Sequence, residues 1–105
     1  MKTGLNYIVD ARNKQLAKGR TVELDVQNNK DNQLIIAAQL ISNPDLDNND
    51  IETLEFLIDV SELAELGWSR GYLKKVMRKP YIERLAIAGG LIAAEIDKIL
   101  FEEQN

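Results

Sequence analysis

Histidine and cysteine are both absent from this chain of 105 residues, and proline occurs only twice. Without histidine the protein lacks the commonest general base, the commonest metal ligand and every nucleophile–histidine pair. Without cysteine it has neither disulfides nor thiolate metal sites, which fits a reducing cytoplasm. Most hydrolase mechanisms are thereby excluded. The acid–base and cation-binding chemistry that remains belongs to Asp and Glu carboxylates.

Long apolar runs are also missing. The longest, residues 85–94, has ten residues, about half of the roughly 20 that a membrane-spanning helix needs. Lys2 is not followed by an apolar segment, so the N-terminus does not resemble a secretory signal. We therefore expect a cytoplasmic protein with a single domain, residues 1–105, whose mature chain starts at residue 1 and which has no membrane partner.

Charge is unevenly distributed along the chain, whose net charge is −4. Residues 31–69 contain nine Asp and Glu but no Lys or Arg, whereas residues 68–84, the basic segment, contain six of the thirteen cations, the only Trp and two of three Tyr. An acidic protein repels a long polyanion, so a concentrated cationic patch suits a small anion better. The basic segment therefore predicts a nucleotide-like ligand and no long nucleic acid.

The spacing of apolar residues predicts a mainly helical chain. The polar–apolar alternation of residues 21–26 instead has the period of a short extended strand, and residues 51–66 fit either a helix or a helix with a short strand at 57–60. Pro44 and the Asp and Asn residues around it predict a loop over residues 43–50. The expected helices cover residues 5–18, 32–41, 68–77 and 81–103.

The last expected helix contains Gly89, Gly90, Ala93 and Ala94, which carry little or no side chain. Small residues let another backbone approach closely, although each glycine costs about 1 kcal/mol of helix propensity. We interpret them as the seam of a helix-on-helix dimer.

Three candidate phosphate ligands stand out. Arg84 lies in the first turn of the last helix, where the macrodipole disfavours a cation, so an anionic partner would explain it. Arg20 and Thr21 follow Gly19 in a turn that could present amides, a guanidinium and a hydroxyl; the alternative is a helix cap followed by an ordinary loop.

The basic segment adds Trp68, Tyr72 and Lys79, which combine aromatic stacking with charge. Its alternative interpretation is a solvated helix face.

The central acidic stretch supports two other hypotheses. Glu52, Glu55, Asp59, Glu62 and Glu65 fall partly on one helical face, as in magnesium-dependent nucleotide pyrophosphatases, although the EExxE and ExxD spacing of those enzymes is absent. The other hypothesis is a phage adaptor that binds a host protein through residues 45–65.

A family resemblance runs through nearly the whole chain except residues 43–65. The residues that carry it are Arg12, Gln15, Gly19, Thr21, Glu23, Asp25, Asn29, Gln33, Leu34, Ala37, Ala38, Lys79, Pro80, Arg84, Ala94, Glu95 and Ile96. They resemble the forms ERxxQ, GxTxExD, QLxxAA, KPxxxR and AAEI of small phage proteins, and the group most similar is the first Thoeris anti-defence family. The chain departs from it at Ala11, where Glu is usual, and at residues 68–72, which replace a WPW-type stretch.

The resemblance implies a non-enzymatic sponge, without cofactor, that sequesters an immune signal in the cytoplasm of an infected bacterium. The ligand would be a cyclic ADP-ribose isomer, such as a glycocyclic ADP-ribose, or a cyclic trinucleotide. The implied fold is α+β and mainly helical, with long helices packing in a dimer with a small antiparallel sheet, and the dimers can form a hexamer (a trimer of dimers). It also implies that Arg12 is part of the site, that Arg20 and Arg84 contact phosphate, and that Trp68, Tyr72 or Tyr81 stacks on the base.

Overall fold

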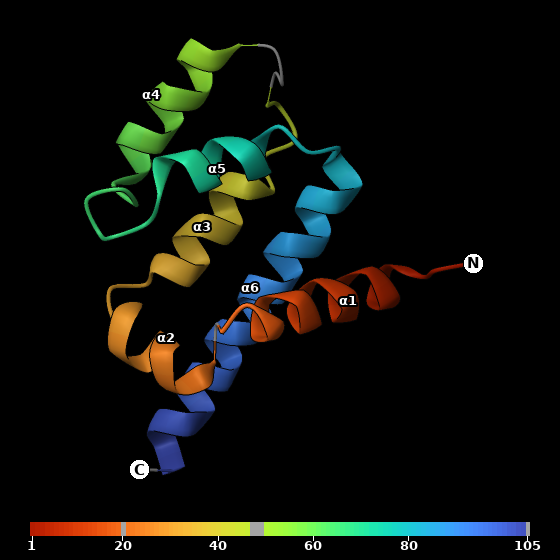
Figure 1. Ribbon diagram of the computed structural model, residues 1–105, viewed down its shortest axis with the longest axis vertical. Helices are drawn as coiled ribbons and strands as arrows, with labels where there is room; N and C mark the ends of the chain where they lie inside the picture. The colour runs from red at the N-terminus through yellow and green to blue at the C-terminus, as the bar shows by residue number, and fades with distance from the viewer. Residues whose placement is uncertain (20, 47–49, 105) are drawn as a thin grey trace.

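The computed structural model describes residues 1–19, 21–46 and 50–104, and these form α-helices joined by turns and loops, with no strand among them (Figure 1). The helices are α1 (Gly4–Ala17), α2 (Val22–Asn28), α3 (Gln33–Ile41), α4 (Ile51–Ser61), α5 (Arg70–Met77) and α6 (Tyr81–Gln104). The expectation of an α+β fold with a small antiparallel sheet is therefore wrong, and the described chain is all-helical.

Segment 21–26 is where the strand prediction fails. Thr21 caps α2, its hydroxyl accepting a hydrogen bond from the backbone N–H of Leu24 at 3.4 Å. In a strand Val22, Leu24 and Val26 would share one face, whereas in the helix the two valines are half-buried and Leu24 is 43% exposed. Six alternating residues also fit two helical turns, so the alternation did not discriminate between the two structures.

Local signals define several other helix ends. Thr3 and Asn6 form a reciprocal capping box at the start of α1. Gly19, just past its end, has a φ of +87°, a conformation that glycine adopts without steric cost. The stretch that fitted either helix or strand is helical: Asp50 caps α4, which continues to Ser61.

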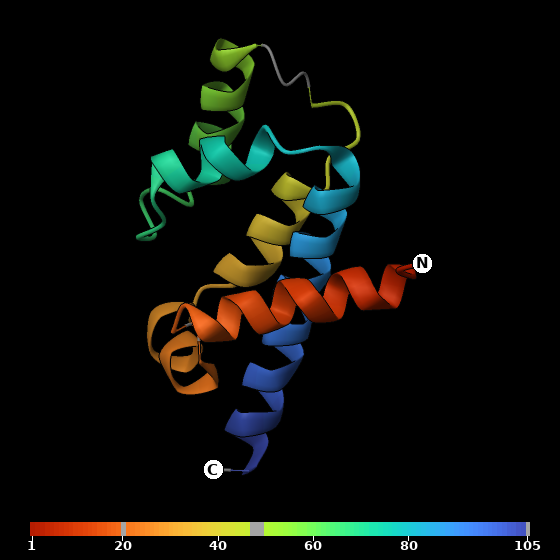
Figure 2. The same cartoon turned by 45° about the vertical axis from the view of Figure 1, so that its right-hand side comes forward.

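The longest helix, α6, supports most of the molecule. Helices α1, α2 and α3 pack directly on it, while α4 contacts α3 and α5. Figures 1 and 2 show α1 crossing α6 near its middle and α3 lying beside its first half. The apolar core lies mainly among α3, α4, α5 and α6, and its largest fully buried side chains are Leu34, Ile41, Leu54, Ile58, Leu63, Leu73, Met77 and Leu91.

The two glycines of α6 mark the point where α1 crosses. A Cβ added to Gly89 would lie 2.7 Å from Cγ1 of Ile8, and one added to Gly90 would lie 2.9 Å from Nε2 of Gln15. The close approach that these glycines predicted is thus made by α1 of the same chain. Within the described residues, no helix has the combination of length and apolar character that crossing a membrane requires.

Candidate anion-binding site

The acidic and basic segments of the sequence meet as neighbours in the fold. Arg70 of α5 pairs with Asp59 of α4, and Nζ of Lys74 lies 3.1 Å from a carboxylate oxygen of Glu55. Each pair joins α4 to α5 at the surface, where an ion pair contributes at most about 1 kcal/mol. Two of the six cations of the basic segment therefore already have partners in the acidic segment.

A cavity of about 490 Å³ opens between α1, α5 and the start of α6. We call it the lysine cavity, because five lysines line it and only two acidic residues do. Its walls are Lys2, Tyr7, Asp10, Ala11, Lys14, Gln15, Lys18, Tyr72, Lys75, Val76, Lys79, Glu83, Ala86 and Ile87. The volume is within the range of about 300–1,000 Å³ typical of small-molecule sites.

Both acidic residues of the lysine cavity have a lysine partner. The Lys2 ammonium lies 2.8 Å from the Asp10 carboxylate, and Lys79 lies 3.7 Å from Glu83, one helical turn further along the chain. The hydrogen bond and the attraction between Lys2 and Asp10 lower the pKa of Asp10 and raise that of Lys2. The Lys2 pair therefore favours the ionised form of the Asp10 carboxylate.

The other three lysines are uncompensated. Lys14 on α1, Lys18 at its C-cap and Lys75 on α5 make no ion pair with any residue that the structure describes. The cavity wall thus has an excess of three positive charges in a protein whose net charge is −4. Cations gathered around a concave surface attract small anions.

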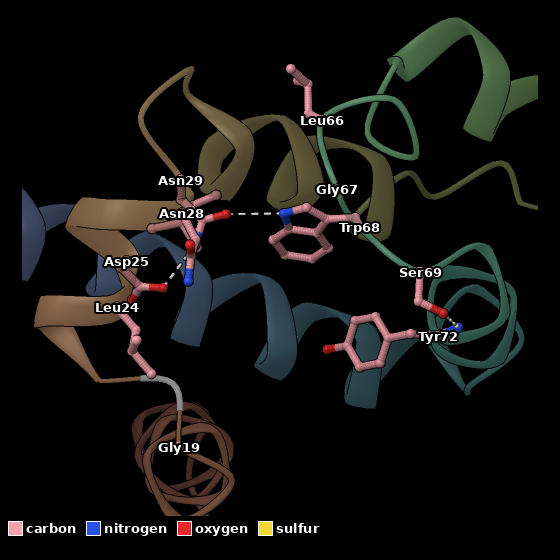
Figure 3. Close-up of a pocket in the computed structure, with 11 residues that line it drawn as sticks. Gly19, Leu24, Asp25, Asn28, Asn29, Leu66, Gly67, Trp68, Ser69 and Tyr72 are labelled. Atoms are coloured by element: carbon pink, nitrogen blue, oxygen red, sulfur yellow. Dashed lines mark hydrogen bonds between the residues drawn. The ribbon is translucent and has the colours of Figure 1, made fainter.

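A second cavity, of about 480 Å³, shares Tyr72 with the lysine cavity and is drawn in Figure 3. We call it the tryptophan cavity. Its walls are Gly19, Leu24, Asp25, Asn28, Asn29, Leu34, Leu66, Gly67, Trp68, Ser69 and Tyr72.

Figure 3 shows the two aromatic rings of the tryptophan cavity on one side and the polar side chains of α2 on the other. The indole N–H of Trp68 donates to Oδ1 of Asn29 at 3.0 Å, and Nδ2 of Asn29 donates to Oδ1 of Asp25 at 2.9 Å. Trp68 and Tyr72 meet edge to face, with their ring centroids 6.1 Å apart. This network fixes the indole in place and leaves aromatic and amide surface along one cavity.

Tyr72 is the residue that the two cavities share. Its position is set by the start of α5, where the hydroxyl of Ser69 accepts a hydrogen bond from the Tyr72 backbone N–H at 3.1 Å. A ligand that extends around this ring would meet lysines on one side and the Trp68 indole on the other. Such a pair of neighbouring sites suits a molecule with both anionic and flat apolar parts.

The predicted site residues lie in different places. Tyr72, Trp68 and Lys79 line the cavities. Thr21 caps α2, and Arg20 lies outside the described residues. These residues are therefore not one cluster.

Arg12 is buried between α1 and α6, where its Nη2 donates to Oδ2 of Asp97 at 3.1 Å. Its Nε and Nη1 are also buried and meet no hydrogen-bond acceptor among the described residues. The lysine cavity does not include Arg12 in its walls.

Arg84 forms a structural junction. It is 3% exposed. Its Nη1 donates to the carbonyls of Ile41 at 3.0 Å and Asn43 at 2.7 Å, and its Nε donates to that of Lys79 at 3.0 Å. The guanidinium also lies 5.0 Å from the centre of the Tyr81 ring, and burial lowers the pKa of Arg84. In this conformation the Arg84 guanidinium binds backbone carbonyl oxygens, which carry partial negative charge, in place of the phosphate that the sequence predicted as its partner.

Sequence reasoning missed the contribution of α1 and the residues beside its ends, namely Lys2, Lys14 and Lys18. A signal was present: Lys14 and Lys18 are four residues apart, which places them on one face of a helix. What could not be foreseen is that this face turns toward α5. The basic segment supplies only Lys75 and Lys79 of this cationic wall.

The acidic residues of the metal hypothesis do not converge in the described part of the chain, where no three of them form a group that could hold a metal ion. Glu55 and Asp59 face the cations of α5 instead. No protein-family model, curated protein or solved structure matches the chain.

Proposed function

We propose that this protein binds a small phosphate-bearing molecule of the nucleotide type and holds it without converting it. The observation that carries the proposal is the excess of positive charge in the lysine cavity, where Lys14, Lys18 and Lys75 have no anionic partner among the described residues. A bound phosphate would supply the counter-charge that these three ammonium groups lack.

The two cavities would divide the ligand between them. The lysines would bind the phosphate oxygens by charge-assisted hydrogen bonds, while Tyr72 and Trp68 would offer aromatic surface to a base. Lysine is a mobile point charge, so this wall suits several arrangements of phosphate, and the aromatic side would provide more of the selectivity.

The family resemblance suggests the ligand: an isomer of cyclic ADP-ribose, or a cyclic trinucleotide, made as an immune signal in an infected bacterium. A sponge of this kind would act in the host cytoplasm by lowering the free concentration of the signal. Slow release of the ligand, with no need for transition-state stabilisation, would then determine its effectiveness.

The test is to incubate the purified protein with cyclic ADP-ribose isomers and cyclic trinucleotides, filter it, heat it and analyse the released nucleotide by chromatography. Intact ligand recovered only after heating is the expected result. Conversion to a product would replace the sponge with an enzyme. Free ligand throughout would refute nucleotide binding and favour a protein partner.

A matched pair of variants tests the cavity itself. Lys14→Gln together with Lys18→Gln removes two uncompensated charges and should weaken binding roughly 10- to 100-fold, equivalent to about 1.4–2.8 kcal/mol. Lys30→Gln removes an exposed lysine outside the cavity and should leave affinity unchanged. Fluorescence of Trp68, the only tryptophan, reports binding directly. Equal affinities of the two variants would contradict this location of the site.

A further inference from the structure

Asn29, the C-cap of α2, connects the tryptophan cavity with the second half of α6. Its side chain lies in the cavity wall, where Oδ1 accepts the indole N–H of Trp68 at 3.0 Å and Nδ2 donates to the Asp25 carboxylate at 2.9 Å (Figure 3). Its backbone carbonyl accepts a hydrogen bond from Nζ of Lys98 on α6 at 3.0 Å. Lys98 itself lines neither cavity. Asn29 therefore joins the indole to a side chain that lies outside the cavity.

Lys98 is fixed in position by its surroundings. It is 5% exposed. Its ammonium also lies 3.1 Å from a carboxylate oxygen of Glu95, one helical turn earlier on α6, and that side chain is 14% exposed. Burying a charge is costly unless the charge is paired and hydrogen-bonded, so the ammonium stays where it reaches both acceptors. The carbonyl of Asn29 is thereby tied to α6.

The end of α2 depends on partners from elsewhere in the chain. This helix has seven residues, too few to be stable alone, and the last carbonyls of a helix have no donor within it. Gln33 of α3 donates to the carbonyl of Asn28 at 3.2 Å, and Lys98 donates to that of Asn29. Loss of Lys98 would leave α2 attached through Gln33 and through its packing on α6. It would release the Asn29 carbonyl alone.

We propose that Lys98 is a positioning residue of the tryptophan cavity, which acts through Asn29 to orient the indole of Trp68. The side chain of Asn29 is short, so a shift of its backbone moves the amide that holds the indole. The consequence for affinity rests on the proposed function, in which this ring stacks on a base. An indole correctly placed about a tenth to a third of the time would weaken binding roughly 3- to 10-fold, because apparent affinity scales with the fraction of competent protein.

The placement of the indole can be tested without ligand, because Trp68 is the only tryptophan. Glu95→Gln with Lys98→Met is compared with Glu95→Gln alone, so that neither variant leaves a buried carboxylate without its cation. In the double variant the emission of Trp68 should move to longer wavelength and its quenching by acrylamide should increase, whereas Glu95→Gln should change neither. Asp97→Asn is the matched control: it weakens the pair with Arg12 of α1 at the neighbouring position of α6, and should also change neither.

Circular dichroism shows whether each variant keeps its helices. If Lys98→Met does not fold in the Glu95→Gln background, Lys98→Gln replaces it, because the glutamine amide ends one bond short of the lysine ammonium. Unchanged emission and quenching in the folded double variant would overturn the proposal, since the indole would not need Lys98. Shifts of the same size in Asp97→Asn would also overturn it, since they would reflect a general loosening of α6.

Affinity provides the second measurement. With a cyclic ADP-ribose isomer as the probe, the double variant should bind roughly 3- to 10-fold more weakly than Glu95→Gln. Altered emission with equal affinities would overturn the positioning role, because the ligand would not depend on the orientation of the indole. If the unmodified chain binds no nucleotide, the proposed function fails, while the emission without ligand still decides whether Lys98 orients Trp68.

Discussion

Replacing Arg84 with alanine should destabilise the fold itself, before any ligand is considered. The buried guanidinium donates hydrogen bonds to the carbonyls of Ile41 and Asn43 at the end of α3 and of Lys79 before α6. It therefore ties the end of one core helix to the beginning of another across more than 40 positions of sequence. Carbonyls at a helix C-terminus have no partner within the helix, so Arg84 supplies one.

The size of the effect follows from those contacts. A hydrogen bond to a charged group contributes about 1.5–3 kcal/mol, but the three share one side chain and are not additive. The carbonyls of Asn43 and Lys79 are partly accessible and can bind water, whereas the bond to Ile41 is buried. Including the cavity left by the side chain, we expect the free energy of unfolding to fall by about 3–5 kcal/mol.

Such a loss is a large part of the roughly 5–15 kcal/mol that stabilises a domain of this size. At about 5 °C per kcal/mol, the midpoint of thermal unfolding should fall by roughly 15–25 °C. Circular dichroism during heating, and again during urea titration without nucleotide, measures both quantities. Arg78→Ala is the control, because Arg78 belongs to the same basic segment but is exposed, and it should change the midpoint little.

An unchanged midpoint for Arg84→Ala would refute this reasoning. It would mean that the three carbonyls do not need the guanidinium, and Arg84 would return as a candidate phosphate ligand. The two roles are separable by measurement, because a structural residue affects stability without ligand and a phosphate ligand affects affinity in a folded protein.

Three further predictions test local contacts. Gly89→Ala alone should be neutral or should lower the free energy of unfolding by up to about 2 kcal/mol, because the new Cβ meets Ile8. In an Ile8→Ala background the same substitution should raise the free energy of unfolding by about 1 kcal/mol in urea titrations, and destabilisation there would contradict the contact. Trp68→Phe should lower the free energy of unfolding by about 1 kcal/mol, because the hydrogen bond to Asn29 is lost. Asn29→Ala should lower it by a similar amount and shift the fluorescence emission of Trp68, and unchanged emission would argue against that hydrogen bond. Hydrogen bonds from Thr53 lower the pKa of Asp50. The ionised Asp50 cap therefore stabilises α4 fully above the unfolded pKa of about 4, and this contribution is lost as the pH falls through the lower folded pKa. Asp50→Asn should flatten that part of the acid-unfolding curve, and an identical curve would argue against this role of Asp50.

Much of the helical framework could be predicted because helix ends are local. A capping Thr3, a glycine at position 19 and a proline at position 80 act on the residues beside them, and the apolar spacing of the last helix was long enough to be unambiguous. Segment 21–26 was too short for its period to discriminate, and a strand was expected where α2 forms. The sheet implied by the family resemblance is absent from the described chain for a separate reason: a resemblance in scattered short motifs does not determine secondary structure at every position.

The candidate site divides in the same way. The sequence alone determined that this is an acidic, histidine-free chain with a basic, aromatic segment. It also indicated a close approach at Gly89 and Gly90, although the neighbour expected there was a second copy and the one observed is α1 of the same chain. Only the tertiary structure decided that Lys14 and Lys18 face Lys75 across one cavity, and that Arg84 is bound by carbonyls instead of being exposed. The physical reason is that these positions are far apart along the chain, and they meet only because their helices pack on, or lead into, the same long α6.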